Sequence, residues 1–502
     1  MADDPQAEVI EFLRDPATHG VERVDTVETH ISVVFLAGNR AYKLKRAVKY
    51  PYLDFSTVAK RRAMCRAELV LNRRTAPALY REVRAISRGP DGRIGWGPRG
   101  TVLDWVVVMA RFDETKRFDR LALDAGLVAA LAERIARFHA AAAPRRDRGG
   151  GAAMAAVALT NIRHLRDSRT AGFDAAAIDA LEAAAAAEAA RLGPLFDRRR
   201  DAGKVRLCHG DLHLANIFLG EDGPVLFDCV EFSEEIATID VLYDLAFVAM
   251  DLMHHRRADL ASLVCNRYLD LADEEDGFAA LPFLVAVRAA IRAHVAGSAL
   301  DRGWGGDAAA ARRYLAEAAA ALAPAAPLLV AVGGLSGSGK STLAARLAPA
   351  LGRAPGARLL RSDVARKRRF GVAPETRLPP AAYTPAVSAL VYRELGERAA
   401  ALLAGGAAVV IDAVALRPQE RAAFAAVAAA AGVRFRGLWL DAPEAAMAER
   451  IRRRRADASD ATPEVLARQA AADPGAIDWL RLDAGGGAEA TEQAARRALG
   501  IG

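Results

Sequence analysis

The octapeptide Gly334-Leu-Ser-Gly-Ser-Gly-Lys340-Ser341 decides the fold of the C-terminal third of the chain. It follows the apolar run Leu328 to Val332 and matches the pattern G-x-x-x-x-G-K-[ST] at every fixed position. Loops of this pattern join a strand to a helix, and their backbone N–H groups surround phosphate groups. The sequence therefore predicts an α/β domain with a parallel sheet and a nucleotide triphosphate at this loop.

The residues of this loop have distinct predicted roles. The Lys340 ammonium group reaches the β and γ oxygens of the triphosphate and takes part in catalysis, and the Ser341 hydroxyl group holds Mg²⁺. The glycines allow the backbone to approach the phosphates closely. The other predicted nucleotide-binding residues of the loop are Gly334, Gly337, Gly339 and Thr342.

Polar residues that follow later apolar runs complete this predicted site. Asp412 is the predicted second Mg²⁺ ligand, and it is followed by Ala413 rather than by the glutamate with which hydrolytic motors activate water. This difference favours phosphate transfer over mechanical work. Asp363 is either a catalytic base or a substrate anchor. Arg450 and Arg454 lie on a predicted helix, and they either close over the transferring phosphate or belong to a solvated helix face.

A second phosphate-chemistry signature lies upstream, in the stretch His209-Gly-Asp211-Leu-His213-Leu-Ala-Asn216. Phosphoryl transfer to a hydroxyl group requires a carboxylate beside the acceptor and ligands for Mg²⁺. Asp211 is the predicted base, and Asn216 and Asp228 are the predicted Mg²⁺ ligands, at the spacing of a kinase catalytic loop. We expect His209 to orient the loop. His213 has no role that the motif requires, so we expect a packed or exposed loop histidine there.

The stretches H-G-D-L-H-L-A-N-I-F, L-F-D-C-V-E-F and D-V-L-Y-D-L-A contain Asp211, Asp228 and Asp244. Together they resemble the aminoglycoside phosphotransferase and choline kinase superfamily, over about residues 20–320. The resemblance implies a protein-kinase-like α+β fold, in which ATP lies between a β-rich lobe and a helical lobe.

The same resemblance implies an ATP-binding lysine on a strand, paired with a glutamate on a helix. Glu68 is the candidate glutamate, and Lys43 is the preferred lysine. Lys45 lies on the same side of the predicted strand, so spacing alone leaves both lysines open.

The C-terminal features resemble the P-loop small-molecule kinases, the group that contains gluconate kinase, adenylylsulfate kinase and the zeta-toxin-like kinases. This resemblance covers about residues 328–485. The order of the two modules resembles bacterial proteins in which an aminoglycoside phosphotransferase-like domain precedes an ATP-binding kinase-like domain. Both resemblances imply ATP and Mg²⁺ as cofactors.

The chain of 502 residues is too long for one hydrophobic core and is expected to form two or three folding units. The predicted small lobe covers about residues 20–112, with strands at 30–36, 41–48 and 105–112 and a helix at 56–74. The helical lobe covers about 113–323. The segment 324–327, Pro-Ala-Ala-Pro, is the predicted linker, so the predicted domains are 1–323 and 328–502. The fold class is a bilobal α+β domain followed by an α/β P-loop domain.

Composition and charge limit the remaining classes. A net charge of +7 suits anionic ligands such as ATP and tolerates nucleic acid, but only 6% of residues are aromatic and no nucleic-acid module is visible. Four cysteines without a C-x-x-C pair indicate neither a disulfide scaffold nor a zinc site. The first 20 residues lack a signal-peptide core, and charges interrupt the longest apolar runs. We expect a cytoplasmic protein with no membrane partner, and the oligomeric state stays open.

The leading hypothesis is a bifunctional phosphotransferase that depends on ATP and Mg²⁺. Each domain would transfer the γ-phosphate of ATP to its own small hydroxylated acceptor, of which aminoglycosides are one class. The alternative is a protein that senses nucleotide or processes nucleic-acid ends, in which only one of the two domains is catalytic.

Overall fold

The computed structural model describes residues 5–50, 53–454 and 457–501. Its contacts divide the chain into two compact units, residues 1–149 with 199–248 and residues 150–198 with 249–502. The chain passes between the units three times, after Gly149, within α6 (Ala175–Asp201) and within α8 (Val241–His254). The helical segments 150–198 and 249–322 therefore group with the C-terminal segment. The predicted domain division at 324–327 follows chain order, and it stays a prediction.

An antiparallel sheet of six strands forms the N-terminal part of the first unit, in the order β1-β2-β3-β8-β6-β7. The predicted strands correspond to β2, β3 and β8, whereas β1, β6 and β7 were not predicted. The strands are β1 (Val24–Glu28), β2 (Ser32–Ala37), β3 (Arg40–Lys45), β6 (Tyr80–Arg88), β7 (Ile94–Trp96) and β8 (Thr101–Ala110).

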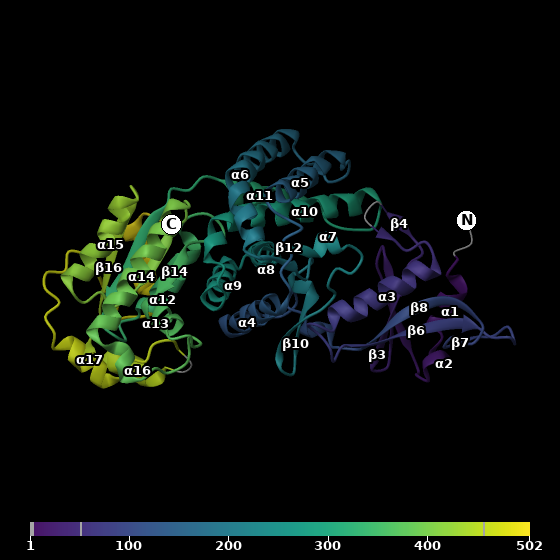
Figure 1. Ribbon diagram of the computed structural model, residues 1–502, viewed down its shortest axis with the longest axis horizontal. Helices are drawn as coiled ribbons and strands as arrows, with labels where there is room; N and C mark the ends of the chain where they lie inside the picture. The colour runs from purple at the N-terminus through teal and green to yellow at the C-terminus, as the bar shows by residue number, and fades with distance from the viewer. Residues whose placement is uncertain (1–4, 51–52, 455–456, 502) are drawn as a thin grey trace. The chain divides into compact units, whose positions relative to one another are not determined.

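Helices cover both faces of this sheet (Figure 1). Val9 and Leu13 of α1 (Ala7–Arg14) join the hydrophobic cluster on one face. Cys65 of α3 (Val58–Asn72) joins a separate cluster with β8 residues on the other face. The Thr57 side chain caps α3 by accepting a hydrogen bond from the Lys60 backbone N–H group. This packing buries Glu68, which lies on α3 and has no exposed surface.

The rest of the first unit consists of short strands, turns and helices around two loops. Strand β9 (Val205–Leu207) pairs with β12 (Thr238–Asp240), and β10 (Ile217–Gly220) forms a hairpin with β11 (Gly223–Leu226). The loops that carry the predicted catalytic residues follow β9 and β11. The other elements are α2 (Pro16–His19), β4 (Lys49–Tyr50), β5 (Leu53–Asp54), η1 (Glu114–Lys116), α4 (Ala125–Ala141), η3 (Leu214–Asn216) and α7 (Glu234–Ala237).

The second unit begins with a group of helices in which α10 (Leu281–Asp301) is central. Both α5 (Gly151–Arg163) and α11 (Ala308–Leu322) pack against α10. The other elements of this group are η2 (His164–Asp167), α6, α9 (Ala258–Leu271) and η4 (Glu275–Ala280).

The stretch Glu275–Asp301 is long and apolar enough to span a membrane by length and composition alone. In the structure, 72% of its most apolar window is buried. Core helices of soluble proteins meet the same criteria, so this is weak evidence for a membrane span. The predicted absence of a membrane partner stays a prediction.

The C-terminal part of the second unit is a parallel sheet, as the sequence predicted, and it has five strands in the order β14-β15-β13-β16-β17. Residues on alternate sides of β13, such as Val330 and Ala331, are both buried, so the sheet is covered on both faces. The strands are β13 (Leu328–Gly334), β14 (Arg358–Arg361), β15 (Val409–Asp412), β16 (Arg434–Asp441) and β17 (Leu480–Asp483). The last of them was not predicted.

Helices α12 and α18 contribute to the hydrophobic cluster on one face of this sheet, and α14 contacts β13, β14 and β15. The helices are α12 (Lys340–Leu347), η5 (Ala348–Ala350), α13 (Ser362–Arg369), η6 (Pro380–Tyr383), α14 (Pro385–Ala404), α15 (Pro418–Ala430), α16 (Glu444–Arg453), α17 (Pro463–Ala470) and α18 (Ala488–Leu499).

A buried ion-pair network joins the parallel sheet to the helices that precede it in the chain. Arg358, the first residue of β14, is fully buried and forms ion pairs with Asp270 at 2.6 Å and Glu275 at 2.8 Å. Its guanidinium group also donates to the Asn266 side-chain oxygen at 2.9 Å. Glu275 accepts from Arg398 of α14 as well, at 2.6 Å. The edge strand β14 is therefore bonded to α9 and η4.

Substitution of Arg358 tests this network. In Arg358→Ala, Asp270 and Glu275 lose their buried partner, and we expect the free energy of unfolding to fall by about 3 kcal/mol. The midpoint of urea denaturation, followed by tryptophan fluorescence, measures this loss. Arg434→Ala, which removes an exposed arginine at the start of β16, should change it by less than about 0.5 kcal/mol. Equal effects of the two substitutions would contradict the network's role.

Candidate active sites

The first candidate site contains the predicted pair of lysine and glutamate. The Lys43 Nζ atom on β3 lies 2.9 Å from Glu68 Oε1 on α3 and donates to Asp228 Oδ1 at 2.6 Å. Asp228 belongs to the loop after β11, so the three predicted residues come together from three separate elements. Burial alone would lower the pKa of Lys43, but the carboxylates of Asp228 and Glu68 outweigh it and raise this pKa well above its usual value.

Lys45 contacts the same glutamate from the next position on this face of β3. Its Nζ atom donates to Glu68 Oε2 at 2.6 Å and also to the Glu231 carboxylate. Only 2% of the Lys45 side chain is exposed, compared with 12% of the Lys43 side chain. Both lysines therefore lie between Glu68 and a carboxylate of the loop after β11, which is Asp228 for Lys43 and Glu231 for Lys45, and Lys43 is the more exposed of the two. Glu231 is a member of this cluster that the sequence did not indicate.

The two buried carboxylates of this cluster have opposite pKa shifts. Burial disfavours the ionised form of Glu68, but its ion pairs with Lys43 and Lys45 outweigh burial and lower its pKa to about 2. Burial raises the pKa of Glu231, because Lys45 compensates only in part and Glu68 adds a negative charge nearby. Glu68 is therefore the carboxylate that stays ionised between the two lysines.

The predicted base lies in the loop after β9. The Asn216 side-chain amide donates to Asp211 Oδ2 at 3.0 Å and to the Asp211 backbone carbonyl oxygen at 2.9 Å. His213 Nε2 lies 3.4 Å from the same Oδ2 atom, and its Nδ1 atom accepts from the Ala215 backbone N–H group. His213 is thus a packed loop histidine, one of the two alternatives expected, and it also contacts the predicted base. In the sequence, this contact was indicated only by the position of His213, two residues after Asp211.

A fully buried carboxylate fixes the backbone of this loop. Asp244 on α8 accepts from the backbone N–H groups of His209 and Gly210, both at 3.0 Å, and its Oδ2 atom lies 3.1 Å from His139 Nε2. The His209 Nε2 atom bonds the Phe227 carbonyl oxygen at 2.8 Å. His209 therefore connects the two loops that carry the predicted catalytic residues, in agreement with its expected orienting role.

The backbone of Asp228 has an uncommon conformation. Its φ angle is 64°, in the left-handed region that side chains other than glycine seldom adopt. The Asp228 N–H group donates to the Tyr80 hydroxyl oxygen at 3.1 Å, and the next N–H group donates to Asn72 Oδ1 at 2.8 Å. These bonds hold the strained turn, and 40% of the Asp228 side chain stays exposed. Such strain is concentrated at functional sites.

The second candidate site lies at the carboxyl end of β13. Gly334, Gly337 and Gly339 have φ angles of 134°, 83° and 98°. A Cβ atom at Gly337 would lie 2.5 Å from the Met447 carbonyl oxygen, so this position has no room for a side chain. The Lys340 ammonium group donates to the Leu335 carbonyl oxygen at 2.8 Å, which keeps it within the loop. Burial lowers the pKa of Lys340, and the charges of Asp412 and Asp363 oppose this effect.

Two predicted carboxylates follow neighbouring strands of the sheet. Asp412 ends β15, and Asp363 comes two residues after the end of β14. The parallel register pairs Arg361 with Asp412, and the Arg361 Nε atom lies 3.4 Å from Asp412 Oδ2. Burial raises the pKa of Asp363, and the negative charge of Asp412 raises it further. The carboxyl ends of β13, β14 and β15 thus place the loop and both carboxylates at one edge of the sheet.

The predicted lid arginines lie beside this loop. Arg450 donates to the Ala484 carbonyl oxygen at 2.8 Å and to the Ser338 carbonyl oxygen at 3.4 Å. Arg454 Nη1 is buried and has no hydrogen-bond partner among the described residues. Gln469 on α17 accepts from the Ser336 N–H group at 2.8 Å, a contact with the loop that the sequence did not indicate. Ser341 is half-buried, and Thr342 is exposed on α12.

Both sites offer groups that fit Mg²⁺ and a triphosphate. Asn216 and Asp228 at the first site, and Ser341 and Asp412 at the second, are oxygen donors of the kind that Mg²⁺ prefers. The Ser338 hydroxyl oxygen in the second loop is buried without a hydrogen-bond partner among the described residues, so the loop retains unsatisfied polar capacity. The residues present therefore fit the predicted cofactors.

Two substitutions distinguish the lysines of the first site. The Lys340→Ala background isolates this site. In that background we expect Lys43→Ala to weaken ATP binding by at least about 10-fold, because the Lys43 ammonium group lies beside Asp228, the predicted Mg²⁺ ligand. We expect Lys45→Ala to lower the free energy of unfolding by about 3–5 kcal/mol, because Glu68 and Glu231 lose a buried partner.

Isothermal titration calorimetry with a nonhydrolysable ATP analogue and urea denaturation measure the two effects. Lys43→Ala should remain folded, since Glu68 keeps its ion pair with Lys45. If Lys45→Ala retained full stability and lost the nucleotide, the roles of the two lysines would be reversed.

Two family models match separate segments of the chain. The model described as phosphotransferase enzyme family matches residues 95–284, which include Asp211, Asn216 and Asp228. The model described as AAA domain matches residues 329–473, which include the glycine-rich loop and Asp412. Lys43 and Glu68 lie outside both matched segments.

Two mycobacterial relatives match nearly the whole chain. Uncharacterized protein Rv2004c of Mycobacterium tuberculosis and uncharacterized protein Mb2027c of Mycobacterium bovis are each 33% identical to it over 486 residues, which cover 92% of this chain and 93% of each relative. The alignment therefore includes both segments that the family models match, in the same order.

Among solved structures, a gluconokinase from Sinorhizobium meliloti is 23% identical, covers 35% of this chain and 92% of its own, and has a TM-score of 0.26. A choline/ethanolamine kinase family protein from Mesorhizobium loti is 16% identical, covers 64% of this chain and 95% of its own, and has a TM-score of 0.40. From the relatives and the family models, the chain belongs to the family of these mycobacterial proteins, and it is an ATP-dependent kinase in which a phosphotransferase-family segment precedes an AAA-type P-loop segment.

Proposed function

We propose that the protein is a bifunctional phosphotransferase, in which each site transfers the γ-phosphate of Mg²⁺-bound ATP to a hydroxyl group of its own small-molecule acceptor. The observation that carries this proposal is that each site retains the side chains that phosphoryl transfer requires. The first site has Lys43, Asp211, Asn216 and Asp228. The second has its glycine-rich loop with Lys340, Asp363 and Asp412. A domain that only senses nucleotide would not need an acceptor base.

At the first site, Asp211 takes the proton of the acceptor hydroxyl group. The acceptor oxygen forms a bond to the γ-phosphorus atom while the bond from this atom to the bridging oxygen of ADP breaks. Asn216 and His213 position the Asp211 carboxylate, and Lys43 orients the phosphates. Mg²⁺, held by Asn216 and Asp228, would neutralise negative charge on the triphosphate.

At the second site, Lys340 leaves the Leu335 carbonyl oxygen and contacts the β- and γ-phosphates. Asp363 lies at the edge of the sheet where an acceptor hydroxyl group can approach, and its raised pKa suits a group that exchanges a proton. Ser341 and Asp412 would hold the metal here. The Nη1 atom of Arg454 has no hydrogen-bond partner among the described residues, so it can bind an oxygen of the transferring phosphate.

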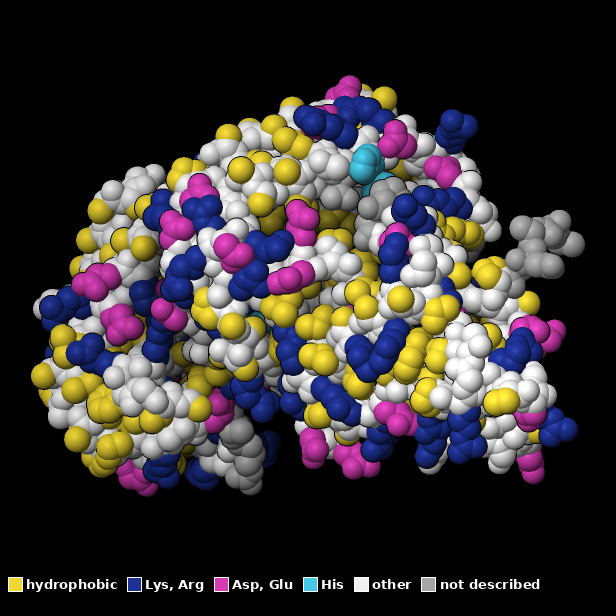
Figure 2. All heavy atoms as spheres, turned by 45° about the vertical axis from the view of Figure 1, so that its right-hand side comes forward, with side chains coloured by type: hydrophobic (Ala, Val, Ile, Leu, Met, Phe, Trp, Pro, Cys, Tyr) yellow, Lys and Arg dark blue, Asp and Glu magenta, His cyan; other side chains and the backbone are white. Residues whose placement is uncertain are grey.

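The charges on the face shown in Figure 2 favour a small acceptor over nucleic acid. Nucleic-acid-binding proteins usually present a continuous positive surface. On the face in Figure 2, Lys and Arg side chains are interspersed with Asp and Glu side chains. The net charge of +7 is therefore not gathered into one patch on this face.

The first prediction of this proposal is that acceptor-stimulated turnover divides between the two sites. ATP consumption is measured with aminoglycosides, sugars, amino alcohols, nucleosides and oligonucleotides. We expect Asp211→Asn to lower turnover with one set of acceptors by about 10²–10⁴-fold, because it removes the base. We expect Lys340→Ala to lower turnover with a different set by at least about 100-fold, because it removes transition-state charge stabilisation.

Asp222→Asn is the matched control, because Asp222 is exposed in the turn between β10 and β11. It should leave both activities unchanged. If nucleotide binds but no acceptor raises turnover at either site, the bifunctional proposal fails and the sensing alternative takes its place. Turnover stimulated only by oligonucleotides would favour the processing of nucleic-acid ends.

The second prediction concerns the metal. Chelation with excess EDTA should lower turnover at both sites by at least about 100-fold, because the carboxylates and the triphosphate are both negatively charged and repel one another without the metal. Added Mg²⁺ should restore both activities. Activity that persists in EDTA at either site would show that its carboxylates do not act as metal ligands.

A further inference from the structure

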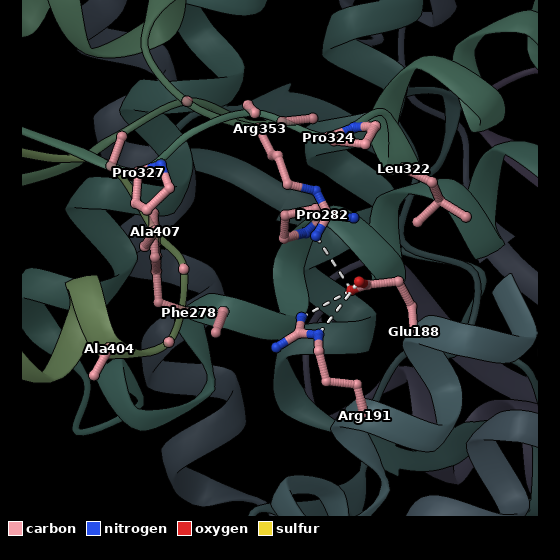
Figure 3. A pocket seen from close by; sticks show the side chains of 17 residues that line it. Glu188, Arg191, Phe278, Pro282, Leu322, Pro324, Pro327, Arg353, Ala404 and Ala407 are labelled. Carbon is pink, nitrogen blue, oxygen red and sulfur yellow. Dashed lines mark hydrogen bonds and ion pairs between the residues drawn. The ribbon is translucent and has the colours of Figure 1, made fainter. Parts of the chain in front are cut away.

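A cavity of about 360 Å³ lies in the second unit, away from its nucleotide loop (Figure 3). Its walls come from α6, from the start of α10, from the segment 324–327 and from the loops before β14 and β15. The glycine-rich loop and Asp412 lie at the carboxyl edge of the parallel sheet. The cavity lies at the opposite, amino edge, so it is separate from the candidate active site of this unit.

The charged groups of the cavity surround a single carboxylate. Arg191 donates to Glu188 at 2.8 Å, and Arg353 donates to it at 3.2 Å. Figure 3 shows both guanidinium groups directed at this carboxylate. Burial opposes ionisation of Glu188, but the two arginines outweigh it and lower its pKa. Two arginines and one glutamate leave one positive charge among the charged residues described in the lining.

Arg353 has unused hydrogen-bonding capacity. Its Nε and Nη2 atoms are buried and have no hydrogen-bond partner in the described part of the chain. Only 15% of its side chain is exposed, so water satisfies little of it. Arginine side chains carry five N–H donors in a planar fork that matches carboxylate and phosphate oxygens. An oxyanion in the cavity would offer acceptors to the Arg353 guanidinium group and balance the remaining positive charge.

The rest of the lining is apolar. Phe278, Pro282, Leu322 and Pro327 face the same space. Pockets of this size bind small organic molecules through apolar walls and a few directed polar groups. The lining therefore matches a molecule with one anionic group and a compact apolar body.

We propose that this cavity is a binding site for a small organic oxyanion, a phosphate monoester or a carboxylate, that is distinct from both nucleotide sites. Arg353 is the principal ligand, and Arg191 is the second. The proposal is independent of which acceptors the two active sites use, because it concerns binding alone.

Calorimetric titration of the full chain with phenyl phosphate and with benzoate tests the site. Saturating Mg²⁺ and a nonhydrolysable ATP analogue occupy both nucleotide sites during the titration. We expect at least one of the two compounds to bind with one-to-one stoichiometry. Binding of phenyl phosphate alone identifies a phosphate monoester site, and binding of benzoate identifies a site that takes carboxylates. If neither compound bound at concentrations up to about 10 mM, the proposal would be overturned.

Two variants locate the binding. Arg353→Gln should weaken it by at least about 10-fold, since it removes the charged donor. Ala404 is an exposed residue of the lining, and Ala404→Phe should fill part of the cavity without removing a charge. This variant tests the site if Arg353→Gln folds poorly. Arg434→Gln is the control and should bind like the wild type. Unchanged binding in folded Arg353→Gln and Ala404→Phe, or equal affinity for inorganic phosphate and phenyl phosphate, would contradict the proposal.

Discussion

The Glu68 carboxylate is fully buried between the ammonium groups of Lys43 and Lys45, and the first site is arranged around this contact. A buried charge is stable only when it is paired, so α3 and β3 have to pack with these groups in contact. The second carboxylate of each lysine comes from the loop after β11. One ion-pair cluster thus fixes a helix, a strand and a loop relative to one another. Asp228 takes its place beside Lys43 as part of this cluster.

The second site depends on a different constraint, the parallel direction of its strands. Parallel strands end at one edge, so residues that are far apart in the sequence become neighbours there. The register pairs Arg361 with Asp412, which places a positive group between carboxylates before any ligand binds. Lys340 lies against its own loop in the same way. In both sites, cationic side chains therefore have partners within the protein, and a bound triphosphate would replace some of these partners with its own oxygens.

The sequence was sufficient to predict the two fold classes, because each depends on a motif that is continuous in the chain. The glycine-rich loop and the stretch from His209 to Asn216 have fixed spacing, and the structure places Asp211 and Asn216 in direct contact. The parallel sheet was predicted from apolar runs of strand length. Strand β6 was missed because Arg81, Glu82 and Arg84 interrupt its apolar pattern.

What the sequence did not predict depends on contacts between distant residues. Lys43 and Lys45 have equivalent positions on β3, and only their second partners, Asp228 and Glu231, separate them. These partners lie 185 and 186 residues away along the chain, so no local pattern contains them. Gln469 reaches the glycine-rich loop across a comparable interval. The position of His213 was near the motif, but its contact with Asp211 depends on the conformation of the loop.

The buried position of Arg358 has a consequence for how this protein can be recombined. The segment 324–327 looks like a natural place to cut the chain, since it lies between a helix and a strand. A fragment that began at residue 328 would carry Arg358 without Asp270 and Glu275. The guanidinium group, which is buried in the full chain, would then be exposed to solvent. An exchange of P-loop segments between relatives would keep its edge strand intact only if α9 and η4 were transferred with it. The segment that has to be transferred with the C-terminal sheet thus begins well before the glycine-rich loop, within the helices that precede it.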